Sequence, residues 1–144
     1  MRCKSEIVEI AEEKLRSAHL LLTHGFVDDA YYLGGYVIEL FLKAMVCKTL
    51  QIDNFFEEIF LKNSLKNPQA FKVHDLKQLL VLSGLYKIHN FESANPQFKT
   101  YWSVIISWDE THRYIRGKAK SEVENFLESI NAVAVWIKRH LYQN

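Results

Sequence analysis

Residues 121–141 read SEVENFLESINAVAVWIKRHL and carry the clearest helical pattern in the chain. Apolar side chains recur there at intervals of three and four residues, which puts them on one face of an α-helix. The side chains on this face are Val123, Phe126, Leu127, Ile130, Val133, Ala134, Ile137 and Leu141. Ser121 and Glu124 have the spacing of a capping box, so we predict that the helix begins there and packs its apolar face against a core.

The first third of the chain predicts two helices joined by a short turn. Residues 5–24 have apolar positions at steps of three and four, and Gly25 follows in the position of a C-cap. Asp28 stands where an N-cap is expected, and a second helix runs from there to about Leu50. The core stripe of this second helix consists of Ala30, Gly34, Val37, Phe41 and Met45. Because the turn is short, we expect an antiparallel helical hairpin.

Two glycines, Gly34 and Gly35, lie inside the second predicted helix. Each costs about 1 kcal/mol relative to alanine in a helix interior, so a compensating interaction is expected. A glycine has no Cβ and lets a neighbouring element approach the helix backbone closely. We expect the first helix, residues 5–24, to make that approach.

The middle of the chain is less regular. Residues 51–73 predict an insertion with a short helix over residues 53–60. Another short helix over residues 76–82 opens directly after His74 and Asp75. Pro96 marks the entry to a fourth main element. The positions that keep helical spacing in this element are Phe98, Tyr101, Trp102, Ile105 and Trp108.

The composition agrees with packed helices. Of 144 residues, 49% are apolar, whereas five are Gly and two are Pro, which disfavours a turn-rich β fold. The length is typical of one domain with a substantial core. We therefore predict a single all-α domain over residues 1–144, an antiparallel up-and-down helical bundle of four to five main helices with a short helical insertion.

Charge, cysteines and apolar runs narrow the class of protein further. The formal net charge is only +1, so any contact with nucleic acid must come from a local patch. Cys3 and Cys47 form no Cys-x-x-Cys pair, which indicates reduced thiols. Residues 1–10 lack the apolar stretch of a secretion signal, and no apolar run approaches the ~20 residues that cross a bilayer. We predict a cytoplasmic protein without membrane contact.

Signatures of common enzyme chemistry are missing from the sequence. The chain has no Gly-rich phosphate loop, no Gly-x-Ser-x-Gly, no His-Glu-x-x-His and no zinc-type Cys/His spacing. His19 and His24 are five residues apart, about 140° around a helix, which makes them poor joint metal ligands. We predict that both histidines face solvent, that the protein uses no metal and no cofactor, and that it is not an ordinary metabolic enzyme.

A polar and aromatic stripe runs along the second predicted helix. Tyr32, Tyr36, Glu39 and Lys43 recur at steps of four, three and four, opposite the core stripe. One interpretation is structural: Glu39 and Lys43 form an i,i+4 ion pair, and the tyrosines make helix–helix or dimer contacts. The other is functional: the stripe forms one wall of a cleft in which the tyrosines stack on a base and Lys43 binds a phosphate.

Positive charge is concentrated between Trp108 and Lys120, ahead of the last helix. The basic side chains in this segment are His112, Arg113, Arg116, Lys118 and Lys120. The start of a helix adds unpaired backbone N–H groups, so an anion could bind there. The alternative is a solvated basic turn that pairs with Asp109 and Glu110.

Three segments resemble the HEPN domain family, in its small stand-alone prokaryotic form. They are DDAYYLGGYVIELFLKA at residues 28–44, HDLKQLL at residues 74–80, and the Trp-x-x-x-x-Arg-Tyr of Trp108 to Tyr114. Their order and spacing before a long final helix carry the resemblance, which covers nearly the whole chain. It implies an antiparallel helical bundle, commonly a homodimer, in toxin–antitoxin, defence or stress systems, often beside a minimal nucleotidyltransferase partner.

The resemblance also implies where a site would lie. Many HEPN proteins are metal-independent RNases that use an Arg followed after four to six residues by a His, and no Arg in this sequence has a His at that spacing. The positions that match recurring residues of this branch of the family are Glu39, Lys43, His74, Arg113 and Tyr114. The resemblance gives them roles in ligand binding or in maintenance of the fold.

We therefore expect a non-catalytic module that binds a nucleotide, RNA or a partner protein. The residues assigned to ligand binding are Tyr32, Tyr36, Glu39, Lys43, His74, Trp108, Arg113 and Tyr114. One alternative is an RNase with a displaced active site, in which His112 works with Arg113 or Arg116 across a dimer. Another is a homodimeric scaffold. The apolar residues assigned to its interface are Phe55, Phe56 and Phe60.

Overall fold

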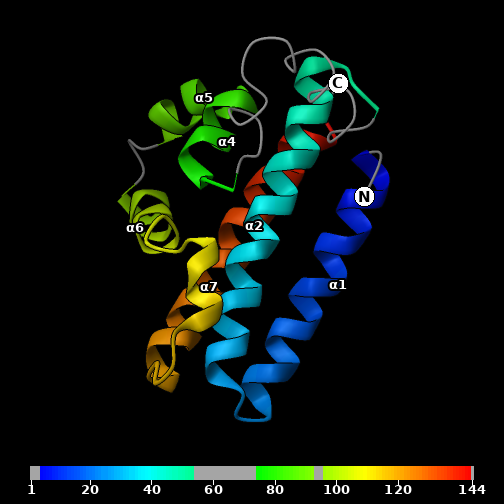
Figure 1. The fold of residues 1–144 in the computed structure, drawn as a ribbon. Coiled ribbons are helices and arrows are strands. Elements are labelled where there is room, and N and C mark those ends of the chain that lie inside the picture. The colour runs from blue at the N-terminus through cyan, green and yellow to red at the C-terminus, as the bar shows by residue number, and fades with distance from the viewer. Residues whose placement is uncertain (1–3, 54–73, 93–95, 144) are drawn as a thin grey trace.

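The computed structural model describes residues 4–53, 74–92 and 96–143, and these ranges contain helices and no strand (Figure 1). The helices are α1 (Lys4–Thr23), α2 (Val27–Leu50), α4 (Leu76–Leu82), α5 (Leu85–Glu92), α6 (Pro96–Ile105), the 3₁₀-helix η2 (Glu110–Tyr114) and α7 (Lys120–Leu141). The predicted all-α helical bundle is confirmed. The helix predicted over residues 53–60 falls outside the described residues, except for Asp53.

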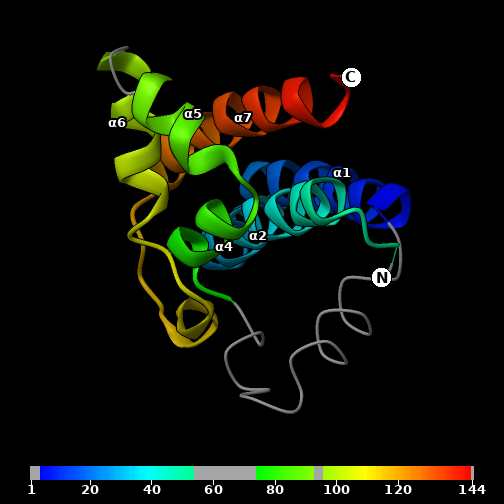
Figure 2. The same ribbon diagram turned by 90° about the horizontal axis from the view of Figure 1, so that it is seen from above.

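The long helices α1, α2 and α7 lie side by side and form the body of the bundle (Figures 1 and 2). α1 and α2 make the predicted antiparallel hairpin, and Gly25 turns the chain between them with a φ of +87°. α1 is also antiparallel to α7, because His19 Nε2 lies 3.0 Å from Asn131 Oδ1 while Lys138 Nζ donates to Glu12 at 3.0 Å. His19 and His24 are exposed, as predicted.

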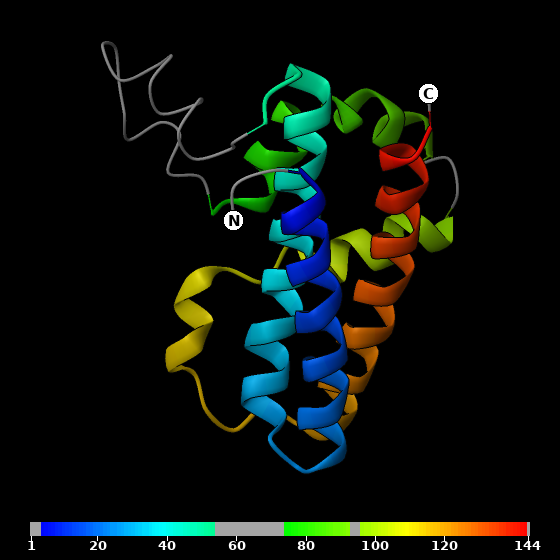
Figure 3. The same cartoon turned by 90° about the vertical axis from the view of Figure 1, so that its right-hand side faces the viewer.

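The segment after α6, which contains η2, returns the chain to the lower end of the bundle, so that the start of α7 lies beside the start of α2 (Figure 3). The rings of Tyr31 and Phe126 are 4.4 Å apart between centroids at this end. At the other end Lys48 Nζ donates to the backbone carbonyl of His140. Of the shorter helices, α4 packs against α2 and α6 packs against α7.

Helix α4 has the boundaries that the sequence predicts, because its N-cap is made locally. The Asp75 carboxylate accepts hydrogen bonds from the backbone N–H of Lys77 at 2.9 Å and of Gln78 at 3.1 Å. Helix α5, which follows one turn later, was not predicted from the sequence. α6 begins at Pro96 as expected, but it ends at Ile105, so Trp108 lies beyond the helix.

The two glycines of α2 do allow close approach, but α1 is the wrong partner. A Cβ on Gly34 would lie 2.6 Å from Cδ2 of Leu127 in α7. A Cβ on Gly35 would lie 2.1 Å from the indole ring of Trp108. Both glycines therefore make room for side chains that arrive from the second half of the chain, at the start of α7 and just after α6.

Two predicted caps are wrong. α7 begins at Lys120, and its N-cap residue Ala119 makes no side-chain hydrogen bond, so Ser121 and Glu124 form no capping box. α2 begins at Val27, with Phe26 in the N-cap position, so Asp28 lies in the first turn of the helix. The side chain of Asp28 instead makes contacts with the segment before α7 that the spacing of local residues could not reveal.

Helix α2 is the central helix of the bundle. The predicted core stripe is buried, and most of the remaining circumference of the helix is buried as well. Among the described residues, α2 is the one helix long and apolar enough to cross a bilayer, and 83% of its apolar window is buried inside the fold. That degree of burial is also a property of core helices in bundles.

Candidate functional site

A buried ion pair lies on α2. Lys43 Nζ donates to Oε2 of Glu39 at 2.9 Å, and the two residues are 2% and 0% exposed. The predicted i,i+4 pair is therefore present, but these two residues do not lie opposite the core, because they belong to it. Two buried opposite charges neutralise one another, whereas removal of one partner leaves an uncompensated charge. The burial of Lys43 favours the structural interpretation of this pair over a role in phosphate binding.

His74 extends this pair to the surface. Its Nδ1 lies 3.3 Å from Oε1 and 3.2 Å from Oε2 of Glu39, and its side chain is 43% exposed. Its Nε2 lies 3.5 Å from Oε2 of Glu110, the first residue of η2. The imidazole thus stands between two carboxylates and connects α2, the start of α4 and η2. The sequence predicted His74 as a site residue but did not predict Glu110 as its neighbour.

The two tyrosines of the stripe are half-buried on α2, next to this cluster. The rings of Tyr32 and Trp108 are 5.9 Å apart between centroids. Burial raises the pKa of the Tyr36 hydroxyl, and the negative charge of Glu39 and the nearby Tyr32 raise it further. Trp108 is 3% exposed, and its Nε1 has no hydrogen-bond partner among the described residues. The stripe is therefore continuous with the core at Trp108 and with the ion pair at Glu39.

The 3₁₀-helix η2 has a capping box that was not predicted from the sequence. The Asp109 carboxylate accepts from the N–H of Thr111 at 2.8 Å and from the Thr111 hydroxyl. His112 Nδ1 lies 2.9 Å from the backbone nitrogen of Asp109, from which it accepts, and 3.0 Å from its carbonyl oxygen. The hydrogen bonds from Thr111 lower the pKa of the Asp109 carboxyl. Nδ1 of His112 is therefore engaged in holding the turn. Because Nδ1 accepts there, the neutral ring carries its proton on Nε2, which disfavours His112 as a catalytic base.

The segment between η2 and α7 is fastened to the start of α2 by Asp28. Its Oδ2 accepts from the N–H of Gly117 and its Oδ1 from the N–H of Lys118, each at 2.9 Å. The Lys118 ammonium lies 4.3 Å from the centroid of the buried Tyr31 ring and 3.2 Å from Glu122. Backbone donors that could have held a foreign anion just ahead of α7 thus bind a carboxylate of the chain itself.

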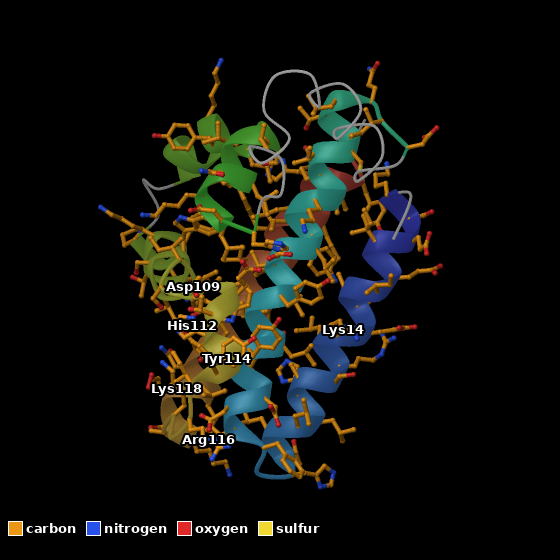
Figure 4. The ribbon with its side chains drawn as sticks, viewed as in Figure 1. Lys14, Asp109, His112, Tyr114, Arg116 and Lys118 are labelled. Carbon is orange, nitrogen blue, oxygen red and sulfur yellow. The ribbon has the colours of Figure 1, made fainter. Side chains whose placement is uncertain are left out.

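Tyr114 is the most exposed of the large hydrophobic residues among the described part of the chain, with 79% of its surface in solvent. Figure 4 shows Asp109, His112, Tyr114, Lys118 and Arg116 along one edge of the bundle, with Lys14 on α1 across α2. Arg116 is exposed. The backbone of Arg113 belongs to η2, and its side chain lies outside what the structure describes. Arg113 therefore stays a prediction.

The structure brings together most of the predicted site residues around one face of α2. Tyr32, Tyr36, Glu39, Lys43, His74 and Trp108 form one cluster. Tyr114 belongs to η2, whose first residue contacts His74. The contributors that sequence reasoning missed are Asp28, Tyr31 and Glu110. Asp28 was assigned to a cap, and Tyr31 and Glu110 have no pattern that distinguishes them from neighbouring apolar and acidic residues.

Other features of the described residues do not coincide with this cluster. No group of three or more His, Cys, Asp or Glu side chains among them is arranged to hold a metal ion. A cavity of about 310 Å³ lies at the C-terminal end of α2, where its lining begins at Cys47, one helical turn after Lys43. Its lining consists of Lys4, Cys47, Lys48, Gln51, Ile52 and Asp53.

The fold and the cluster define an all-α helical bundle with a buried ion pair and an aromatic, partly basic edge. Comparison with protein-family models, with curated proteins and with solved structures gave no match to this chain.

Proposed function

We propose that the chain is a HEPN-like binding module that holds a nucleotide or a short single-stranded RNA without cleaving it. Its binding surface, called here the η2 edge, consists of the exposed Tyr114 and Arg116 and the half-buried Tyr32 and Tyr36. The observation that carries the proposal is the display of Tyr114, 79% exposed, on a turn with a complete capping box.

The turn that carries Tyr114 is anchored on both sides. Asp109 and His112 cap it at the start, and Asp28 holds Gly117 and Lys118 shortly after it. These anchors fix the backbone that carries the exposed ring. The turn therefore loses little conformational freedom when a base stacks on Tyr114. Stacking of one base on an aromatic side chain contributes about 1–3 kcal/mol.

The charges at the η2 edge suit a short ligand better than a long one. Arg116 is exposed and Lys118 follows it, so one or two phosphates can be met by guanidinium or ammonium groups. Lys118 also forms an ion pair with Glu122, and Asp109 and Glu110 add negative charge nearby. Few phosphate contacts imply a shallow dependence of affinity on salt.

Binding without cleavage agrees with the chemistry of the described residues. The sequence has no Arg followed by His at the spacing of the family's RNases. His112, the histidine of the displaced-site alternative, is engaged with the backbone of Asp109. The ion pair of Lys43 and Glu39 is buried, so it stabilises the fold beside the surface rather than contacting phosphate.

The biological setting and partners follow from the resemblance alone and belong to the same proposal. We infer a homodimer that works with a minimal nucleotidyltransferase in a toxin–antitoxin, defence or stress system. The apolar residues proposed earlier for a dimer contact, Phe55, Phe56 and Phe60, lie outside the described residues. Co-expression with a nucleotidyltransferase encoded beside this chain, followed by purification through a tag on one partner, tests this part separately from RNA binding.

Binding can be measured by fluorescence anisotropy of labelled RNAs of about eight nucleotides, within the site sizes of single-strand binders. Tyr114→Ala should weaken binding about 5- to 150-fold, the equivalent of one stacked base. The matched control is Tyr142→Ala, because Tyr142 is also exposed, at 68%, but lies at the far end of α7. Unchanged affinity of the Tyr114 variant, or no binding of any RNA or nucleotide, would contradict the proposal. The η2 edge would then be tested as a surface for a protein partner.

A further inference from the structure

His74 contacts both the buried ion pair and η2. Its Nδ1 faces both oxygens of Glu39 at 3.2 and 3.3 Å, and its Nε2 faces Glu110 at 3.5 Å. Glu39 is already paired with Lys43 at 2.9 Å, and its negative charge contributes to the raised pKa of Tyr36. Asp75, next in the chain, uses its carboxylate to cap α4.

The two protonation states of an imidazole differ in the number of N–H groups they offer. A neutral ring has one N–H, whereas the protonated ring has two and carries a positive charge. In the neutral ring the N–H belongs on Nδ1, where it can donate to the buried Glu39, which has no access to water. Nε2 then presents a lone pair to the carboxylate of Glu110. In the protonated ring, Nε2 also donates, and both carboxylates have a partner.

We propose that His74 is a proton-operated link that fastens η2 to α2 and α4 when it is protonated and releases Glu110 when it is neutral. Glu39 and Lys43 form the fixed side of the link, because both are buried and bonded to one another. Glu110 is the movable side, because its side chain is half exposed and it opens a short 3₁₀-helix. η2 carries His112 and Tyr114, so the state of His74 sets how firmly the displayed tyrosine is held.

The link is independent of what the η2 edge binds. It depends on the geometry of His74, Glu39 and Glu110, and it would operate for a nucleotide, an RNA or a protein ligand alike. His112 is a second titratable group on η2 and lies within the same turn, so a pH response of η2 has two possible sources. A test must therefore follow the imidazoles of His74 and His112 separately.

The experiment is an NMR titration of the full-length protein between roughly pH 5 and pH 8, the range in which histidines titrate. It records the imidazole signals of His74 and His112 together with the backbone amides of residues 110–114. We expect the amides to shift with the same midpoint as the His74 imidazole. In Glu110→Gln, His74 should still titrate, while the amide shifts that follow it are lost.

Two controls make each outcome decisive. His74→Gln should remove the amide shifts that Glu110→Gln removes, whereas His19→Gln, at an exposed position on α1, should leave them unchanged. The proposal is overturned if the amides of η2 follow only the His112 imidazole in all variants. It is equally overturned if His74 titrates without any shift in η2, or if His74 does not change protonation in this range.

Discussion

Asp28 and Lys118 are joined by a hydrogen bond across 90 residues of sequence: Oδ1 of Asp28 accepts the backbone N–H of Lys118 at 2.9 Å. The other carboxylate oxygen accepts the N–H of Gly117, whose φ is +85°. This contact places the segment after η2 against the start of α2. It therefore determines where Tyr114 and Arg116 lie relative to the tyrosines of α2.

Asp28→Ala should lower the free energy of unfolding by about 1.5–3 kcal/mol, the range for hydrogen bonds to a charged group. Denaturant unfolding measures the loss. Asp29→Ala is the matched control, because Asp29 is exposed and lies in the same first turn, where both aspartates interact with the helix dipole. Equal losses in the two variants would mean that the contacts to Gly117 and Lys118 contribute nothing.

Removal of one partner of the buried ion pair should be more costly. Lys43→Ala leaves the Glu39 carboxylate buried without its ammonium partner, and we expect a loss of about 3–5 kcal/mol. The double variant Glu39→Gln, Lys43→Met should lose less than Lys43→Ala alone, because no isolated charge remains. Urea unfolding curves of the two proteins decide the point. A double variant less stable than Lys43→Ala would argue that the pair's attraction outweighs its desolvation.

The close approach of Trp108 to Gly35 predicts that a smaller residue at position 108 offsets part of the cost of a larger residue at position 35. Gly35→Ala should destabilise the protein by about 1–3 kcal/mol in spite of the better helix propensity of alanine, because the new Cβ overlaps the Trp108 ring. Combination with Trp108→Leu should recover part of the loss, and a double-mutant cycle on unfolding free energies measures the coupling. Strictly additive effects would contradict the contact.

The capping box of η2 predicts a dependence on acid pH. The pKa of Asp109 is lowered by the hydrogen bonds from Thr111, below the ordinary value of 3.8. A carboxyl whose pKa is lower in the folded state stabilises the protein above its unfolded pKa, and this stabilisation is lost as the pH falls through the folded pKa. Thr111→Val should raise the pKa of Asp109, as followed by NMR of its carboxyl carbon. An unchanged pKa would rule out the hydroxyl as the main cause.

The main features of the fold follow from residue patterns, and the structure gives a physical cause for one of the misses, the cap predicted at Asp28. The spacing of apolar residues predicted α1, α2 and α7, and the local cap at Asp75 predicted α4 to the residue. Asp28 and Ser121 have equally good local spacing, but neither forms the predicted cap. The carboxylate of Asp28 is used by a segment far along the chain, and such a competition between local and distant partners leaves no trace in local spacing.

At the candidate site, too, local contacts could be predicted from the sequence and long-range contacts could not. The i,i+4 spacing of Glu39 and Lys43 was enough to predict their ion pair. Their burial was not predictable, because α2 is apolar around most of its circumference and charged residues are read as its solvent face. The contacts of His74 with Glu39 and Glu110 join three separate elements, so only the folded chain reveals them.

The most direct test of the proposed function is an NMR titration of the isotope-labelled protein with a short single-stranded RNA. We expect amide shifts concentrated at residues 32–36 and 110–118, around Tyr32, Tyr36, Tyr114 and Arg116. Tyr114→Ala should weaken these shifts at the same RNA concentration. An unchanged spectrum at saturating RNA, or shifts confined to the cavity beside Lys4 and Cys47, would contradict the proposal.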